Sequence, residues 1–408
     1  MKPATLVIVG AGLAGAKAAQ ALRREGFDGR VVLVGEEDVR PYDRPPLSKA
    51  YLRGEVGLGR VALHKAGFYE AKGIELLTST RAVALDVAAR EVELSNRERL
   101  RYDGLLLATG ARPRRLSLPG AGLAGVCYLR GIHDAEHLRG AIGPGAQVVV
   151  IGAGWIGCEV AASARGLGAE VALVDVVAQP LERVVGPEVG AIYARLHASH
   201  GVSLHMGVGV ESLRGAGSVE AVCLTDGTVL GAEVVVVGVG VAPAVELAAA
   251  AGLDVANGIV VDQNLATSAP GVWAAGDVAS AFHPLYRTHV RLEHWAAACR
   301  QGPVAARNML GAKQAYDSIG YFWSDQYDLA MEYSGYAPTW EEVVVRAEPA
   351  GGGFVAFWLS GGRVAAGMSA NVEGAATHVE ALVGASAVVD PARLADSGVG
   401  LAEVSGRG

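Results

Sequence analysis

Two short segments of the 408-residue chain place glycines where a backbone must come close to a charged ligand. Each has the spacing G-x-G-x-x-G and continues an apolar run, TLVIVG in the first case and QVVVIG in the second. The first glycine permits a tight turn, the second lets a pyrophosphate approach, and the third lets a helix pack closely on a strand. The helix N-terminus then faces the phosphates. The sequence predicts two dinucleotide sites, on Gly10, Gly12, Gly15 and on Gly152, Gly154, Gly157.

An acidic residue ends the strand that follows each glycine segment, Glu36 in the first unit and Asp175 in the second. A carboxylate there accepts hydrogen bonds from an adenosine ribose and repels the 2′-phosphate of NADPH. Arg183 lies close to Asp175 in sequence and would weaken that preference, unless it is a solvated surface arginine. We expect two bound dinucleotides, a resident FAD at the first site and an exchangeable NADH at the second.

Strand–helix–strand units must carry both sites, since an apolar strand, a helix and a second strand occupy residues 5–37 and 148–175. Strands are also expected within 102–113, where the strand runs into a Thr-Gly turn, at 233–243, and at 271–279, where the strand ends on Gly276-Asp277; a helix is expected from about 294 to 310. After residue 320 aromatic residues cluster and short strands alternate with glycine turns. The predicted fold class is α/β, with two Rossmann-like domains and a C-terminal α+β domain. The expected boundaries are 1–112 with 243–320 for FAD, 113–242 for NADH, and 321–408.

Composition excludes several classes of protein. Hydrophobic residues make up 51% and charged residues 19%, which is ample material for large cores. A formal net charge of −7 argues against a general nucleic-acid binder. The four cysteines have no metal-ligand or C-x-x-C spacing, so no metal site is expected, and they are typical of buried thiols in a cytoplasmic protein. The apolar run at 234–243 is too short to cross a membrane.

Further motifs narrow the family. ATG at 108–110 and AAGD at 274–277 resemble the remaining FAD signatures of the two-dinucleotide flavoprotein superfamily, whose fold is glutathione-reductase-like. RPPLSK at 44–49, LEHWAAACRQG at 292–302 and YFWSDQYD at 321–328 resemble the FAD-dependent NADH:ferredoxin reductases that serve Rieske-type dioxygenases and haem-thiolate monooxygenases. The resemblance covers essentially the whole chain. No cysteine precedes Cys127, so the dithiol chemistry of the superfamily's disulfide reductases is excluded from the first domain.

The resemblance implies roles for single residues. Lys49 corresponds to a lysine beside the flavin, where a positive charge stabilises the reduced anion, and Glu159 corresponds to its partner; the alternative is a solvated lysine and a first-turn glutamate. Val83 is open to a core role, and Arg130 to pairing with Asp134. The implied FAD positions are Gly10, Gly12, Ala14, Gly15, Glu36, Arg44, Pro45, Lys49, Val83, Ala108, Thr109, Gly110, Arg130, Asp277, Glu293, His294 and Trp295. The implied NADH positions are Gly152, Gly154, Ile156, Gly157, Glu159, Asp175, Arg183, Val239 and Gly240.

The resemblance implies a [2Fe–2S] ferredoxin as the electron acceptor. Because the chain has no cysteine set for a cluster of its own, the cluster must be on another protein. Basic residues on or after the helix at 294–310 are candidates for docking an acidic ferredoxin, with a solvated helix face as the alternative. These are Arg300, Arg307 and Lys313, with Trp323.

Two other functions remain open. An NADH oxidase fits the cofactors, whereas a peroxidase of this superfamily needs a cysteine that the first domain lacks. A redox-sensing protein like apoptosis-inducing factor would carry targeting segments and long basic insertions, and neither is seen in this sequence.

Overall fold

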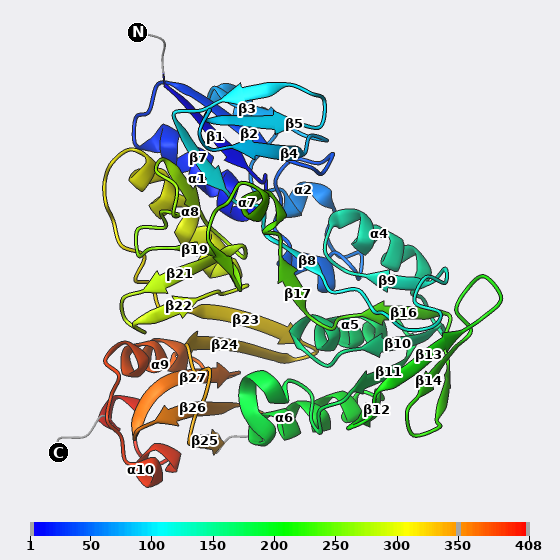
Figure 1. Cartoon of the computed structure of the whole chain (residues 1–408). Helices are drawn as coiled ribbons and strands as arrows, with labels where there is room; N and C mark the ends of the chain where they lie inside the picture. The colour runs from blue at the N-terminus through cyan, green and yellow to red at the C-terminus, as the bar shows by residue number, and fades with distance from the viewer. Residues whose placement is uncertain (1–3, 348–351, 405–408) are drawn as a thin grey trace. The chain divides into compact units, whose positions relative to one another are not determined.

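The computed structural model describes residues 4–347 and 352–404, and the chain forms two compact units (Figure 1). Unit 1 contains residues 1–43, 58–112 and 242–320, and unit 2 contains residues 44–57, 113–241 and 321–408. The chain crosses between the units after residues 43, 57, 112, 241 and 320, and the crossings after 112 and 241 lie in β8 (Ala111–Pro113) and β17 (Val241–Pro243). Both units are built from segments that lie far apart in the sequence.

A five-stranded parallel sheet forms the centre of unit 1, in the order β20-β7-β1-β2-β3. Its strands are β1 (Thr5–Val9), β2 (Arg30–Val34), β3 (Ile74–Leu77), β7 (Gly104–Leu107) and β20 (Val272–Ala274). The three central strands, β7, β1 and β2, are aliphatic runs that are buried over most of their length, as expected for a parallel sheet covered on both faces. The sheet aligns the carboxyl ends of β1 and β7 at one edge.

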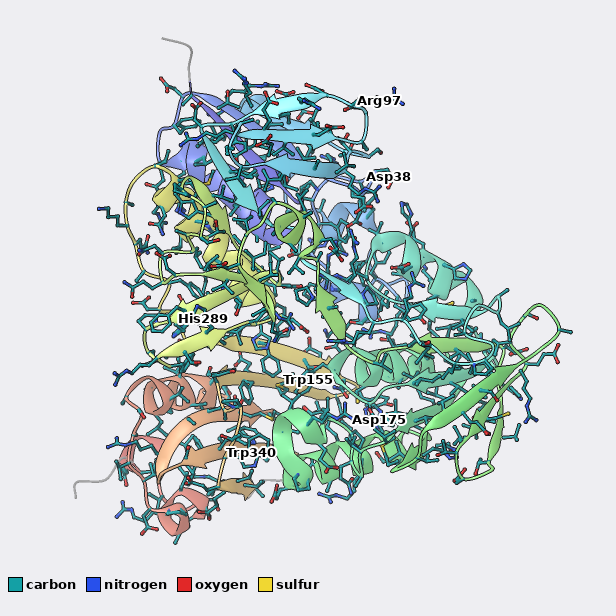
Figure 2. All side chains as sticks on the ribbon, viewed as in Figure 1. Asp38, Arg97, Trp155, Asp175, His289 and Trp340 are labelled. Carbon is teal, nitrogen blue, oxygen red and sulfur yellow. The ribbon has the colours of Figure 1, made fainter. Side chains whose placement is uncertain are left out.

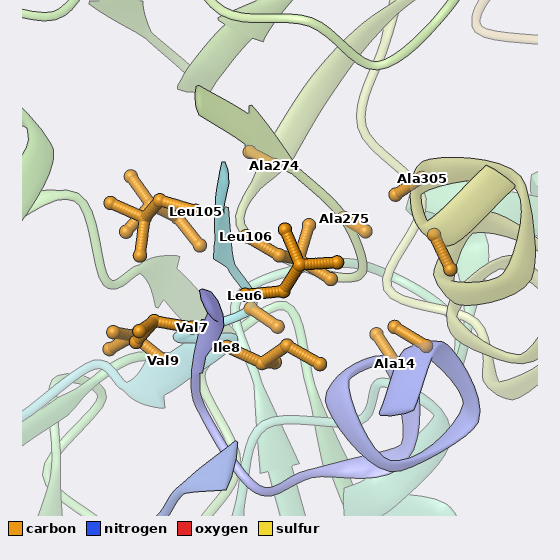
Figure 3. Packing of buried hydrophobic residues seen from close by; sticks show 14 of the residues in the cluster. Leu6, Val7, Ile8, Val9, Ala14, Leu105, Leu106, Ala274, Ala275 and Ala305 are labelled. Atoms are coloured by element: carbon orange, nitrogen blue, oxygen red, sulfur yellow. The ribbon is translucent and has the colours of Figure 1, made fainter. Parts of the chain in front are cut away.

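Two long helices, α1 (Leu13–Arg24) and α8 (Trp295–Met309), pack closely against each other in unit 1. Alanines and glycines allow this approach, since a Cβ at Gly302 would lie 2.3 Å from the carbonyl oxygen of Ala14. Figure 3 shows Ala14 on α1 and Ala305 on α8 beside Leu6, Leu106 and Ala275 of the core. The core thus fixes where α1 begins.

The remaining elements of unit 1 are two smaller sheets and three short helices. An antiparallel sheet contains β4 (Ala82–Asp86), β5 (Glu91–Leu94) and β6 (Arg99–Arg101). A mixed sheet contains β18 (Val255–Ala256), β19 (Gly258–Val261), β21 (Ala279–His283) and β22 (Thr288–Val290). The helices are α2 (Leu58–Val61), α3 (Phe68–Ala71) and α7 (Glu246–Ala250).

Unit 2 contains a second five-stranded parallel sheet, in the order β12-β11-β10-β16-β9. Its strands are β9 (Val126–Tyr128), β10 (Gln147–Ile151), β11 (Glu170–Asp175), β12 (Ser203–Met206) and β16 (Val234–Val237). The helices are α4 (Ile132–Ala141), α5 (Trp155–Gly166) and α6 (Glu182–Ser199), with a 3-10 turn at Pro45–Ser48. An antiparallel sheet follows, with β13 (Val210–Arg214), β14 (Ala221–Leu224) and β15 (Val229–Gly231).

The end of the chain completes unit 2 with an antiparallel sheet in the order β23-β24-β27-β26-β25. Its strands are β23 (Tyr321–Gln326), β24 (Leu329–Gly335), β25 (Glu342–Ala347), β26 (Phe354–Ser360) and β27 (Arg363–Ala370). The helices α9 (Ala375–Gly384) and α10 (Pro391–Ala395) and the 3-10 turn Leu401–Glu403 follow. Apolar side chains of this sheet share one core with α5 and α6.

The predicted α/β class with a C-terminal α+β region is confirmed. The helix expected from about 294 to 310 is α8, and short strands expected after residue 320 are present as β23 to β27. The segment 44–57 lies in the same compact unit as 113–241 and 321–408, a grouping that no local pattern indicates. No helix in the described part of the chain has the length and apolar composition that crossing a bilayer requires.

A buried histidine on α6 predicts how stability changes with pH. His197 is fully buried, and burial lowers its pKa to about 4. The unfolded chain takes up a proton at His197 near pH 6.5 and the folded chain does not, so stability falls as pH falls through this window. We expect the free energy of unfolding to drop by about 2 kcal/mol between pH 7 and pH 5 from this residue.

Urea unfolding at both pH values, for the wild type and His197→Gln, measures the effect. The variant lacks the imidazole and should lose less stability over the same interval. Equal losses in the two proteins would assign the pH dependence to other groups.

Candidate functional site

The first glycine segment forms a turn with one open side. Gly10 has φ +113°, and a Cβ there would lie 2.0 Å from the carbonyl oxygen of Ala108. A Cβ at Gly15 would lie 2.0 Å from the carbonyl oxygen of Gly10. A Cβ at Gly12, in contrast, meets no atom within 4 Å. The turn is therefore closed by packing at its first and third glycines and open at the second, directly at the N-terminus of α1.

Other predicted FAD residues gather around this turn. Thr109 donates its hydroxyl to the carbonyl oxygen of Ala244 at 2.8 Å, which fixes the segment Ala108–Gly110 beside Gly10. The buried side chain of Gln301 on α8 accepts from the amide of Gly276 at 2.8 Å. A Cβ at Gly276 would lie 3.0 Å from the Cβ of Ala14, so the turn that carries Asp277 lies against α1.

The second glycine segment repeats the first. Gly152 has φ +104°, and a Cβ there would lie 2.4 Å from the carbonyl oxygen of Gly238. A Cβ at Gly157 would lie 1.9 Å from the carbonyl oxygen of Gly152, whereas a Cβ at Gly154 meets nothing within 4 Å. Because Gly238 is adjacent, the loop with Val239 and Gly240 borders this turn.

Asp175 ends β11 next to the second turn (Figure 2). One carboxylate oxygen accepts from the amide of Ala153 inside the turn at 2.7 Å, and the other lies 3.3 Å from the amide of Val177. The side chain is half-buried. These bonds fix a negative charge beside the glycine turn, where an acid that selects NADH must lie.

Both turns fit a dinucleotide pyrophosphate. The first turns of α1 and α5 carry no acidic side chain, and no side chain caps either N-terminus among the described residues. The free amides of each helix thus face the open glycine, where the helix dipole favours an anion. The glycine turns before α1 and α5 therefore both fit the dinucleotide pyrophosphate that the sequence implies at each of them.

Lys49 and Glu159 form a buried ion pair in unit 2. Lys49 Nζ lies 2.7 Å from Glu159 Oε1, and the exposed fractions of the two side chains are 12% and 4%. Ser48 Oγ donates to Glu159 Oε2 at 2.5 Å, and Ser324 Oγ donates to Oε1 at 2.7 Å. Three donors compensate the desolvation of the carboxylate, which a buried ion pair requires. The alternative of a solvated lysine and a first-turn glutamate does not fit, because Lys49 is largely buried and Glu159 lies beyond the first turn of α5.

The remaining predicted residues lie in varied surroundings. Val83 on β4 is 44% exposed, so the core alternative is wrong. Asp134 accepts from the backbone amides of Arg130 and Gly131, and Arg44 donates to the carbonyl oxygen of Arg130. Pro45 begins the 3-10 turn before Lys49. Ile156 and Val239 are partly exposed, and Arg183 is exposed on α6.

The start of α8 is fixed by contacts inside unit 1. The Trp295 indole N–H donates to Asp43 at 2.6 Å, and Glu293 pairs with Arg291 at 2.6 Å. His294 is the residue before the helix and keeps some solvent exposure. Burial of its ring by surrounding protein atoms nevertheless lowers its pKa to about 4, although the nearby charge of Asp277 acts to raise it. His294 is therefore neutral at physiological pH.

Redox chemistry on cysteines is not supported by the geometry. Cys127, Cys158 and Cys223 are buried free thiols, and Cys299 is half-buried. Burial raises the pKa of the Cys158 thiol well above its ordinary value, so Cys158 is not a thiolate nucleophile at physiological pH. The described residues include no group of three or more histidine, cysteine or acidic side chains arranged for a metal ion.

Comparison with known proteins decides the family. Residues 4–302 match the model of the pyridine nucleotide-disulphide oxidoreductases, and residues 321–405 match the reductase C-terminal model. The chain belongs to the pyridine nucleotide-disulphide oxidoreductase family. As in other members of this family, FAD and NADH are the expected cofactors, although this chain lacks a dithiol in its first 126 residues.

Among oxidoreductases of this family, the similar proteins include the ferredoxin–NAD(+) reductase component of an anthranilate 1,2-dioxygenase system from Burkholderia cepacia. It is 43% identical over 97% of this chain and 98% of its own length. A solved covalent complex of putidaredoxin reductase with putidaredoxin matches with TM-score 0.95 and 38% identity, over 99% of this chain and 98% of that one. A ferredoxin reductase for the CYP199A2 system from Rhodopseudomonas palustris matches with TM-score 0.94 and 37% identity, over 98% and 100%.

The sequence prediction omitted Ser48, Ser324 and Gln301. Ser48 and Ser324 hold the carboxylate of Glu159, and Gln301 holds the turn that carries Asp277. Ser48 lies in RPPLSK, Ser324 in YFWSDQYD and Gln301 in LEHWAAACRQG, three motifs in which other residues carry the resemblance to the family. Only the fold shows that these three side chains point inward.

Proposed function

We propose that this protein is an FAD-dependent NADH:ferredoxin reductase that supplies electrons to an oxygenase. The observation that carries the proposal is the pair of matching glycine turns, each open at its second glycine and each at an uncapped helix N-terminus. The named reductases that resemble the chain over nearly its full length support the same function. We further propose that it works in the cytoplasm, where NADH is available.

The first turn would hold FAD and the second NADH. Bound FAD accepts two electrons as a hydride and releases them singly, which is what a one-electron acceptor requires. Gly10–Gly15 and the turn at Asp277 would hold its phosphates and ribityl chain, and the exposed Glu36 would accept hydrogen bonds from the ribose. Gly152–Gly157 and Asp175 hold NADH. Lys49, oriented by Glu159, would supply a positive charge that favours the reduced state of the flavin.

The test compares cytochrome c reduction by NADH with and without an added [2Fe–2S] ferredoxin, with NADPH in parallel. Strong dependence on ferredoxin with NADH preferred is the expected result, and several ferredoxins are needed because partners differ. Rapid NADH consumption that ignores every ferredoxin indicates an oxidase. A slow reaction that leaves a long-lived coloured flavin–nicotinamide complex indicates a redox-sensing protein.

Asp175 should determine the choice of nicotinamide. Replacing Asp175 by serine removes the charge that repels a 2′-phosphate, together with the carboxylate oxygen that accepts from the amide of Ala153. We expect the ratio of kcat/KM for NADH to that for NADPH to fall by about tenfold to 100-fold, or roughly 1.4–2.7 kcal/mol. Steady-state kinetics with both nucleotides measures the ratio, and Glu170→Ser, which alters the exposed start of β11, is the control. An unchanged ratio would assign selection to another residue.

Ferredoxin docking can be tested at Lys313 rather than at Arg307. Arg307 pairs with Glu25 at 2.9 Å and donates to Gln314, and Arg300 donates to the carbonyl oxygen of Ile319. Lys313 is exposed just after α8. We expect Lys313→Glu to raise the KM for ferredoxin about threefold to tenfold at low salt, with a smaller effect at high salt. Lys72→Glu, an equal change of net charge at another exposed site of unit 1, should leave the KM unchanged.

A further inference from the structure

A line of buried polar side chains leads from Glu159 through β23 to α6. Ser324 Oγ donates to Glu159 Oε1, and Gln326 Nε2 donates to Ser324 Oγ at 3.3 Å. His197 Nε2 lies 3.0 Å from Gln326 Oε1, and His197 Nδ1 lies 3.1 Å from the hydroxyl of Tyr327. Ser324, Gln326 and His197 are each at most 1% exposed.

Each hydrogen bond in this line has one direction. Gln326 uses its amide N–H toward Ser324, so its oxygen accepts from the imidazole of His197. A neutral imidazole has a single N–H, which is therefore on Nε2, and Nδ1 accepts from Tyr327. Ser324 accepts from Gln326 and so directs its own proton at the carboxylate of Glu159. His197 thus determines the orientation of a hydroxyl that it does not touch.

The line costs more to bury than an apolar core of the same shape. It begins at the carboxylate oxygen that Lys49 also contacts, since Lys49 Nζ and Ser324 Oγ both lie 2.7 Å from Oε1. If the Ser324 proton points elsewhere, Oε1 loses one of its two donors. The position that Lys49 takes on the carboxylate then changes.

We propose that Gln326 and His197 are positioning residues for the Lys49–Glu159 ion pair: by fixing the direction of the Ser324 hydroxyl, they fix the place of the Lys49 ammonium group. The inference rests on the proposed function, in which that ammonium group serves the flavin. Neither residue contacts Lys49, and both act through Ser324.

The test uses the FAD-loaded protein without any ferredoxin. Gln326→Glu replaces the amide N–H by a second acceptor, and His197→Phe removes the donor to Gln326. We expect each to lower the limiting rate of FAD reduction by NADH about tenfold, the effect of losing a hydrogen bond to a charged group. The Kd for NADH should stay unchanged, and the FAD midpoint potential, measured by dye equilibration without NADH, should become more negative. His197→Gln keeps an N–H at the same place and should restore both quantities.

Two further variants separate positioning from general damage. In a Ser324→Ala background, Gln326→Glu should cause no additional loss, because the route to Glu159 is already broken. Trp358→Phe removes a hydrogen bond of 3.2 Å between β26 and Val185 on α6, without touching this line. It should lower stability and leave the rate and the potential unchanged. If Gln326→Glu does not fold, Gln326→Met, which lacks both donor and acceptor, takes its place.

The outcomes distinguish this inference from the proposed function. Unchanged rate and potential in the Gln326 and His197 variants, full additivity with Ser324→Ala, or equal effects of Trp358→Phe would each overturn the inference. If Lys49→Met also leaves both quantities unchanged, the role of the ion pair is wrong and the inference falls with it. A failure to reduce ferredoxin affects only the proposed function, because no ferredoxin is present in these assays.

Discussion

Gly154→Val should yield a folded, yellow protein that binds NADH about 100-fold more weakly than the wild type. Gly154 has φ −78° and ψ −176°, which any residue adopts, and a Cβ there meets no protein atom within 4 Å. The added side chain therefore begins in open space and would occupy the place of the incoming pyrophosphate. Loss of one or two charge-assisted hydrogen bonds from backbone amides, each worth about 1.5–3 kcal/mol, gives the expected magnitude.

The companion variant Gly12→Val should lose FAD binding, whereas Gly154→Val should lose NADH binding. Gly12 has the same open surroundings at the N-terminus of α1, so the chain should fold but purify without FAD and show no flavin absorption. Gly157→Ala is the contrasting control, since its Cβ would lie 1.9 Å from a backbone oxygen and must destabilise unit 2 itself. Flavin absorption, NADH titration and thermal unfolding measure the three variants. Retention of FAD by Gly12→Val would disprove the assignment of the first turn.

Lys49→Met should lower the rate of FAD reduction by NADH about 100-fold, within the range seen when one stabilising donor is removed from a developing anion. The same change leaves Glu159 as a buried carboxylate without its cation, which costs about 3–5 kcal/mol in stability. Stopped-flow reduction and urea unfolding measure the two effects.

The double variant Lys49→Met with Glu159→Gln separates these two effects. A neutral pair no longer buries an uncompensated charge, so most of the lost stability should return. The rate of FAD reduction should remain low, because the cation is still missing. Recovery of the rate together with stability would show that the ion pair is structural only.

The sequence allowed prediction of those features that depend on local pattern. Each glycine turn follows from three glycines between a strand and a helix, and Asp175 follows from the end of the next strand. The buried network at Glu159 could not be predicted in this way, because Ser48 and Ser324 are 111 and 165 residues away from it. The kink in α6 was also missed: Gly186 takes φ +78° and ψ 169° before Pro187, inside one helical segment.

The interleaving of the two units bears on synthesis of the chain. The sheet behind the first glycine turn is completed by β20, and Gln301 fixes the turn at Asp277. A growing chain on the ribosome would therefore lack a finished first glycine turn, the proposed FAD site, until about residue 301 has emerged. At usual rates of elongation this takes on the order of tens of seconds. FAD would then bind late in synthesis, when β1, β2, β3 and β7 have already left the ribosome and β20 has just joined their sheet.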